Sequence, residues 1–185
     1  MDEGAAERVL KRIESSSGRG WLPIVGRRRG EILVEQIRLH RPMRVLEVGS
    51  YVGYSTILMA RELPAGAEVI GIEVDGDEAE EARANIASAE LEADVTVVTG
   101  DALEVIPGLE GEFDMVFLDA DKWEYLSYLR LLEDKLHPSS VVIADNARSS
   151  SRAMADYLEH VRGSGLYASE FRRGGWDGVE ISVRL

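Results

Sequence analysis

Cysteine is absent from this 185-residue sequence, and lysine is scarce, with Lys11, Lys122 and Lys135 as its examples. The absence of cysteine excludes disulfides, thiolate metal sites and cysteine nucleophiles. No apolar run approaches the roughly 20 residues that a membrane-spanning helix needs. The charged segment Met1–Ser17 lacks the apolar core of a signal peptide. We therefore expect a cytoplasmic protein with no membrane partner.

The chain is strongly acidic. It has 34 acidic and 21 basic residues, a formal net charge of −13. Such a surface repels phosphate backbones, which argues against nucleic acid as a main partner. The hydrophobic fraction of 45% is ordinary for a globular protein. The length suits one core, and we predict a single domain over residues 1–185.

Short apolar runs alternate with amphipathic helical patterns in the middle of the chain. The runs predict buried strands at Arg44–Val48, Val69–Ile72, Val95–Thr99, Met115–Leu118 and Val141–Ala144. Apolar residues at helical spacing predict helices at Asp77–Glu90, Trp123–Leu136 and Ser151–Arg162. This alternation is typical of an α/β fold with a mostly parallel sheet and helices on both faces.

The two ends of the chain differ from this middle part. Residues 3–15 and 27–39 predict two helices before the first strand. Leu166–Arg172 and Val179–Leu185 predict a C-terminal antiparallel hairpin, with a turn at Gly174–Gly178. Two edge strands of this kind complete a seven-stranded sheet.

Hard oxygen ligands follow two of the predicted strands. Asp119 and Lys122 come after one of them, and Asp145 and Asn146 after the other. The carboxyl ends of parallel strands meet at the ligand crevice, so Asp119, Asp145 and Asn146 can converge on one cation. Oxygen ligands without His or Cys favour magnesium or calcium. Lys122, beside such a cation, is placed to accept a proton near neutral pH.

Structural roles for the same residues remain open. Asp145 and Asn146 also suit an Asx-type turn. Asp121 also suits a helix cap while Asp119 pairs with Lys122. For one acidic cluster alone we favour the structural role, but two clusters on successive strand ends favour a site.

A glycine-bearing turn follows the first predicted strand, with Glu47 before Gly49 and Gly53. The turn lacks the third glycine of a dinucleotide fingerprint, and Glu47 suits a cationic or amino-bearing ligand. A plain tight turn is the alternative. Glu73 stands at the next strand end, where an acid can hold ribose hydroxyls. Asp101 suits either a helix cap or an adenine contact.

Together these motifs resemble the cation-dependent S-adenosylmethionine O-methyltransferases, which include catechol O-methyltransferase and the caffeoyl-CoA O-methyltransferases. The resemblance runs from about Trp21 to Glu180. It implies a Rossmann-like class I methyltransferase fold, with N-terminal helices in residues 1–40 forming part of the cover over cofactor and acceptor.

The resemblance also implies residue roles. Glu47 and Gly49 would contact the methionine part of the cofactor, Ser55 its carboxylate, and Glu73 the ribose. The full set implied for S-adenosylmethionine is Val25, Glu47, Gly49, Ser55, Glu73, Asp101, Ala102 and Asp119. The implied metal ligands are Asp119, Asp145 and Asn146. Lys122 would be the general base, and Trp21, Lys122 and Asn146 would contact the acceptor.

We therefore predict methyl transfer from S-adenosylmethionine to a hydroxyl of a small, catechol-like acceptor with a divalent cation. The alternatives are a metal-independent methyltransferase, a non-catalytic cofactor-binding module and, more weakly, a nicotinamide dehydrogenase. The basic run Arg27–Arg29 suits a solvated helix face or attraction of an anionic acceptor tail. The N-terminal helices and Trp176 offer contacts for a homodimer.

Overall fold

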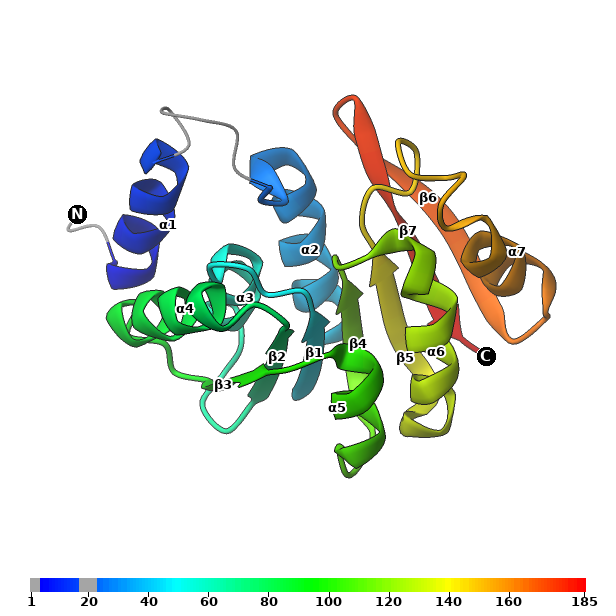
Figure 1. The fold of residues 1–185 in the computed structure, drawn as a ribbon, viewed down its shortest axis with the longest axis horizontal. Helices are drawn as coiled ribbons and strands as arrows, with labels where there is room; N and C mark the ends of the chain where they lie inside the picture. The colour runs from blue at the N-terminus through cyan, green and yellow to red at the C-terminus, as the bar shows by residue number, and fades with distance from the viewer. Residues whose placement is uncertain (1–3, 17–22) are drawn as a thin grey trace.

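The computed structural model describes residues 4–16 and 23–185, which form a seven-stranded sheet between two layers of helices (Figure 1). The strand order is β3-β2-β1-β4-β5-β7-β6. Strands β1 to β5 are parallel, and β7 runs antiparallel to both of its neighbours. This confirms the predicted mostly parallel sheet with a C-terminal antiparallel hairpin.

The elements occupy most of the described residues. The strands are β1 (Arg44–Val48), β2 (Glu68–Glu73), β3 (Asp94–Thr99), β4 (Phe113–Leu118), β5 (Leu136–Ala144), β6 (Tyr167–Gly174) and β7 (Asp177–Arg184). The α-helices are α1 (Ala5–Ser16), α2 (Gly26–His40), α3 (Tyr54–Ala60), α4 (Gly76–Ser88), α5 (Ala102–Gly108), α6 (Tyr125–Leu132) and α7 (Ala155–Gly163). Short 3₁₀ helices flank α6 as η2 (Lys122–Glu124) and η3 (Glu133–Lys135).

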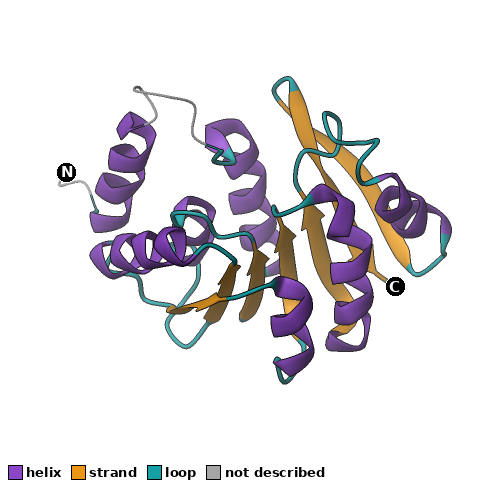
Figure 2. Cartoon of the chain, viewed as in Figure 1, coloured by secondary structure: helices purple, strands orange, loops and turns teal. Residues whose placement is uncertain are grey.

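Each face of the sheet has its own apolar core. Helices α1–α4 lie on one face, and α5–α7 lie on the other (Figure 2). Val45 and Phe117 belong to the first core, whereas their chain neighbours Leu46 and Leu118 belong to the second. Successive side chains of a strand point to opposite faces. A strand between two helical layers is therefore mostly apolar on both faces, as the sequence runs predict, and the buried Glu47 of β1 is an exception.

Three predicted elements differ from the structure. The helix predicted over Trp123–Leu136 ends its α-helical part at Leu132, and Leu136 begins β5. Pro138 explains the change, because proline disfavours helical backbone at and before its position. The strand predicted at Val95–Thr99 is present as β3, but it is an edge strand and only Val97 in it is buried.

The third difference concerns the segment after β5. The helix predicted from Ser151 begins at Ala155 instead. The preceding loop is tied to the hairpin, because Asp177 accepts hydrogen bonds from the backbone N–H groups of Arg148 and Ser149, each at 3.1 Å. The hairpin turn is correspondingly short, and Asp177, expected in that turn, is the first residue of β7.

Among the described helices, none combines the length and the apolar character that a membrane span requires.

Candidate active site

A cavity of about 420 Å³ opens at the carboxyl ends of the parallel strands. The segment before α2, from Pro23 to Val25, forms part of its wall. The cavity brings together most of the residues predicted for a cofactor, namely Val25, Gly49, Ser55, Glu73, Asp101, Ala102 and Asp119. Glu47, the remaining member of that set, lies fully buried in β1 and is not part of the cavity wall.

The turn after β1 has a backbone that requires glycine. Gly49 has φ of 91°, in the left-handed region, and its N–H donates to the Ile72 carbonyl at 2.9 Å. A Cβ at Gly49 would lie 2.7 Å from the carbonyl oxygen of Asp119. The turn therefore passes directly against the end of β4, which places Asp119 beside the loop.

Glu47 is a buried carboxylate with little internal compensation. Its Oε2 accepts a hydrogen bond from the Thr56 hydroxyl, and its Oε1 has no hydrogen-bond partner. Burial raises the pKa of Glu47 to about 7, although the nearby hydroxyls of Ser55, Thr56 and Ser50 oppose the shift. An unpartnered buried acceptor is costly, so this oxygen is suited to a donor supplied by a ligand.

The acids after β2 and β3 are held by backbone N–H groups. Glu73 accepts from Tyr51 N–H at 2.7 Å and from Asp75 N–H at 3.1 Å, so it joins the glycine turn to the start of α4. Asp101 caps α5 by accepting from Leu103 N–H at 2.8 Å. The structural role weighed for Asp101 is thus present, and its place in the cavity wall leaves an adenine contact as a prediction.

The acid after β4 carries an ion pair. Lys122 Nζ lies 2.8 Å from Asp119 Oδ1, and both side chains are largely buried. Burial raises the pKa of Asp119, while the charge of Lys122 opposes that shift. Asp121 caps η2 by accepting from Trp123 N–H at 3.0 Å. Both structural roles weighed for this cluster are therefore present, and Lys122 is fixed next to the cavity wall.

The acid after β5 also carries an ion pair, with a partner that the sequence did not reveal. Asp145 Oδ2 lies 3.0 Å from Arg29 Nη1, which is also 3.8 Å from Asp177 Oδ2. Asp145 is 1% exposed, and burial together with the charge of Asp119 raises its pKa to about 7. The basic run suited a solvated helix face or an anionic acceptor tail, but Arg29 is instead mostly buried and directed at two carboxylates of the protein itself.

Asn146 is oriented by the hairpin. Its backbone is left-handed, with φ of 59°, and its Nδ2 donates to Asp177 Oδ2 at 3.1 Å. Because the amide nitrogen is engaged, Oδ1 is the side-chain atom that remains for a ligand. Asp177 thus links Asn146 and Arg29, a role hidden in the sequence by the glycine-rich turn around it.

The predicted cation ligands can be tested by their donor chemistry. Asp145 Oδ1 is buried and has no hydrogen-bond partner, and Asp119, Asp145 and Asn146 follow adjacent parallel strands. These hard oxygens fit magnesium or calcium. Among residues 4–16 and 23–185, however, no group of three or more His, Cys, Asp or Glu side chains has the arrangement of a metal site. The set has two carboxylates and one amide, and Lys122 and Arg29 already neutralise those carboxylates.

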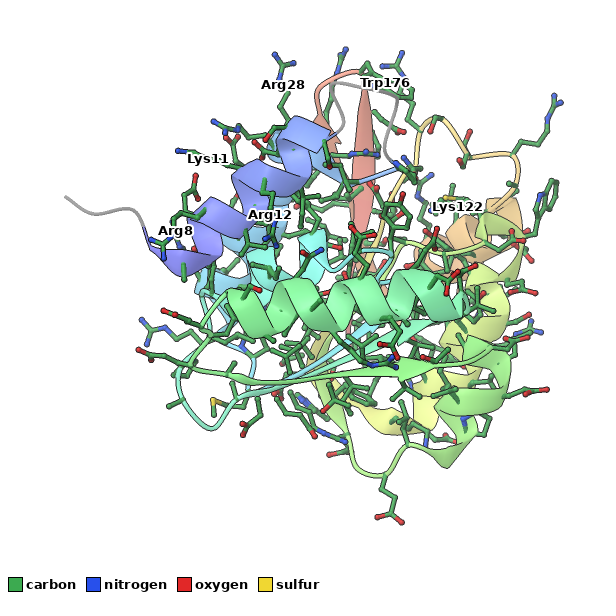
Figure 3. The ribbon with its side chains drawn as sticks, turned by 60° about the vertical axis from the view of Figure 1, so that its left-hand side comes forward. Arg8, Lys11, Arg12, Arg28, Lys122 and Trp176 are labelled. Carbon is green, nitrogen blue, oxygen red and sulfur yellow. The ribbon has the colours of Figure 1, made fainter. Side chains whose placement is uncertain are left out.

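The predicted acceptor contacts are placed in part. Figure 3 shows Lys122 toward the same end of the molecule as Trp176, which lies at the tip of the β6–β7 hairpin. Trp21, which the resemblance implies as an acceptor contact, lies outside the described residues.

Comparison with known proteins supports one family. The family model described as O-methyltransferase matches residues 8–160. Catechol O-methyltransferase B of Danio rerio is 39% identical over 181 residues, 90% of this chain and 67% of the relative. Catechol O-methyltransferase of Mus musculus is 36% identical over 172 residues, 89% of this chain and 64% of the relative. The chain thus spans about two thirds of the length of these relatives.

Solved structures agree with the sequence comparison. The crystal structure of an O-methyltransferase from Bacillus cereus in complex with SAH (S-adenosylhomocysteine) matches with a TM-score of 0.86 and 26% identity. The match covers 100% of this chain and 92% of the other. A family model over most of the chain, relatives above 30% identity and a shared fold lead to one conclusion: the chain belongs to the O-methyltransferase family.

Proposed function

We propose that this protein transfers a methyl group from S-adenosylmethionine to a hydroxyl of a small, catechol-like acceptor, with a divalent cation at the acceptor side. The observation that carries the proposal is the arrangement around one cavity. A buried carboxylate with a free oxygen, Glu47, lies in β1, and the Lys122–Asp119 pair lies at the end of neighbouring β4. One site therefore offers an anion for a cationic cofactor and a group that can hold a proton.

The cofactor side follows from the chemistry of the cavity wall and of Glu47, which is buried next to the wall residues Val48 and Ser55. S-Adenosylmethionine carries an ammonium group, which Glu47 would receive as a charge-assisted hydrogen-bond donor. Ser55 would hold the carboxylate of its methionine part, and the backbone of Val25 and Gly49 would border that part. Glu73 keeps lone pairs for ribose hydroxyls, and Asp101 and Ala102 would border the adenine.

The acceptor side follows from the residues after β4 and β5. Asp119, Asp145 and Asn146 would hold the divalent cation, which would supply positive charge that makes a nearby acceptor hydroxyl more acidic. Lys122, in its neutral amine form, would accept the proton of the reacting hydroxyl at Nζ and so become an ammonium. The acceptor oxygen then forms its bond to the methyl carbon as the carbon–sulfur bond of the cofactor breaks. Walls that fix both reactants supply much of the rate enhancement through orientation.

A second candidate is methyl transfer without a metal. The observation that favours it is the internal neutralisation of the proposed ligands, because Lys122 and Arg29 already pair with Asp119 and Asp145. Such a site can hold its carboxylates in place with no further cation.

A methyl-transfer assay on catechol separates the candidates. We expect S-adenosylmethionine to be consumed with magnesium present and the rate to collapse after chelation, with recovery when magnesium is restored. Asp145→Asn should reproduce the chelated rate. A rate that survives both chelation and Asp145→Asn would contradict the cation's role, and absence of transfer to any hydroxylated acceptor would contradict the methyl-transfer proposal itself.

A further inference from the structure

Arg29 is a buried cation directed at the proposed cation site from outside the strands that form it. It lies in α2, and its Nη1 is 3.0 Å from Asp145 Oδ2 and 3.8 Å from Asp177 Oδ2. Its side chain is 15% exposed and each carboxylate side chain is 1% exposed. One guanidinium therefore neutralises two buried carboxylates that come from different parts of the sheet.

The stem of Arg29 is confined as well as its charge. Its Nε donates to the Val25 carbonyl at 3.0 Å. A Cβ placed on Gly174 would lie 2.6 Å from Arg29 Cγ, so the stem packs against the hairpin backbone. The guanidinium is thus held between α2 and β6, and moving it away from Asp145 requires breaking this packing.

A divalent cation at Asp145 would meet this guanidinium at close range. Like charges a few ångströms apart repel strongly where water is excluded. Removing one partner of a buried ion pair also leaves the other uncompensated. Cation binding therefore has to displace Arg29 from Asp145 or bear the repulsion.

We propose that Arg29 is a built-in competitor of the divalent cation, holding Asp145 and Asp177 in position when no cation is bound and weakening cation affinity. This inference rests on the cation site of the proposed function. Arg29 is a positioning residue in this scheme, since it acts through Asp145. The scheme predicts a protein that keeps its acceptor side ordered without metal and that needs a high metal concentration.

Titration with Mn²⁺, followed by loss of the electron paramagnetic resonance signal of the free ion, tests the proposal. Arg29→Gln should bind Mn²⁺ roughly tenfold tighter or more, because the competing charge is gone. Arg29→Lys keeps the charge and should remain nearer to the wild-type affinity. Arg28→Gln is the matched control for net charge: Arg28 is the adjacent residue, is exposed, and projects outward beside the hairpin tip (Figure 3). Its affinity should match that of wild type.

The direction of the change separates competition from a purely structural role, since loss of a structural residue would weaken binding. Equal or weaker binding by folded Arg29→Gln overturns the role of Arg29 and leaves the cation site standing. If neither wild type nor Arg29→Gln binds Mn²⁺, the cation site is overturned and this inference with it. Neither result bears on methyl transfer itself, which the catechol assay measures.

A second measurement does not depend on Arg29→Gln. In wild-type protein the ¹⁵Nε–Hε resonance of Arg29, assigned by its loss in Arg29→Lys, should shift during titration with Mg²⁺. The Mg²⁺ concentration at half of this shift should match the Mg²⁺ affinity obtained from competition with Mn²⁺. A resonance that stays unchanged while Mg²⁺ fills the site would overturn the proposal even if Arg29→Gln fails to fold.

Discussion

Glu47 and Asp145 are both buried carboxylates near the carboxyl edge of the sheet, and burial raises the pKa of each to about 7. They differ in how their charge is met. Asp145 faces the guanidinium of Arg29, whereas Glu47 has the Thr56 hydroxyl and one oxygen without a partner. The described ion pairs thus neutralise the proposed acceptor side of the site and leave the proposed cofactor side without a cation.

This difference separates two ways of using a buried acid. An acid without an internal cation is prepared for a cationic ligand, and its desolvation cost is offset only when that ligand binds. An acid with an internal cation is already ordered, and a second cation has to compete for it. We therefore expect the cofactor side to gain more from its ligand than the acceptor side gains from its metal.

The largest expected effect concerns Lys122. The variant Lys122→Arg can keep the ion pair with Asp119. Its guanidinium stays charged, however, so it has no neutral form that could accept the proton of the acceptor. We expect kcat to fall by roughly 10²–10⁴ with cofactor affinity nearly unchanged. Steady-state kinetics and calorimetry together measure the two quantities.

Lys135→Arg provides the control, because Lys135 donates to the Leu109 carbonyl and is not part of the cavity. That variant should keep its kcat. Full activity in Lys122→Arg would show that Lys122 is not the base, and the proposed acceptor side would then have no assigned proton acceptor.

The next effect is on stability and concerns Glu47. Below about pH 4.5 the carboxyl is protonated in both folded and unfolded chains and costs nothing. Between about pH 4.5 and 7 the unfolded chain ionises and the folded chain does not, so stability falls as pH rises. Above about pH 7 the full penalty of about 3 kcal/mol applies. As pH rises from about 4.5 to 7, the free energy of unfolding of Glu47→Gln should therefore increase relative to that of wild type by about this amount.

Denaturant unfolding of both proteins, without cofactor, measures this difference at several pH values. Below about pH 4.5 the free energies of unfolding of variant and wild type should differ by a constant amount, and this difference is the internal reference. A difference that does not change between about pH 5 and 8 would show that Glu47 is compensated after all.

Much of the fold follows from the sequence because its signals are local. The apolar runs of β1, β2, β4 and β5 exceed what a one-sided strand needs, and they predict a sheet between two helical layers. The predicted end of the helix at Leu136 was wrong, because Leu136 lies in β5. An apolar residue at this position fits the spacing of the helix and also fits the start of a buried strand. Only the effect of Pro138 on the residues before it distinguishes them.

Some residues of the candidate site can also be predicted from local sequence signals, whereas others cannot. The residues at strand ends, such as Glu73 and Asp119, are placed by the order of the strands, which the sequence pattern predicts. Arg29 and Asp177 come from α2 and from the hairpin, and their meeting depends on how those elements pack. A basic run and a glycine-rich turn carry no local signal of that contact, so sequence reasoning missed both residues.

The most direct test of the account is a calorimetric titration of S-adenosylmethionine in buffers of different ionisation enthalpy. At about pH 6.5 most of Glu47 is protonated, whereas the ammonium of the ligand is already formed. Binding that pairs the two must ionise Glu47, and it should release most of one proton per cofactor. Glu47→Gln should release almost none of it and bind roughly ten- to hundredfold more weakly. Equal affinity and equal proton release in the two proteins would contradict the claim that Glu47 awaits a cationic cofactor.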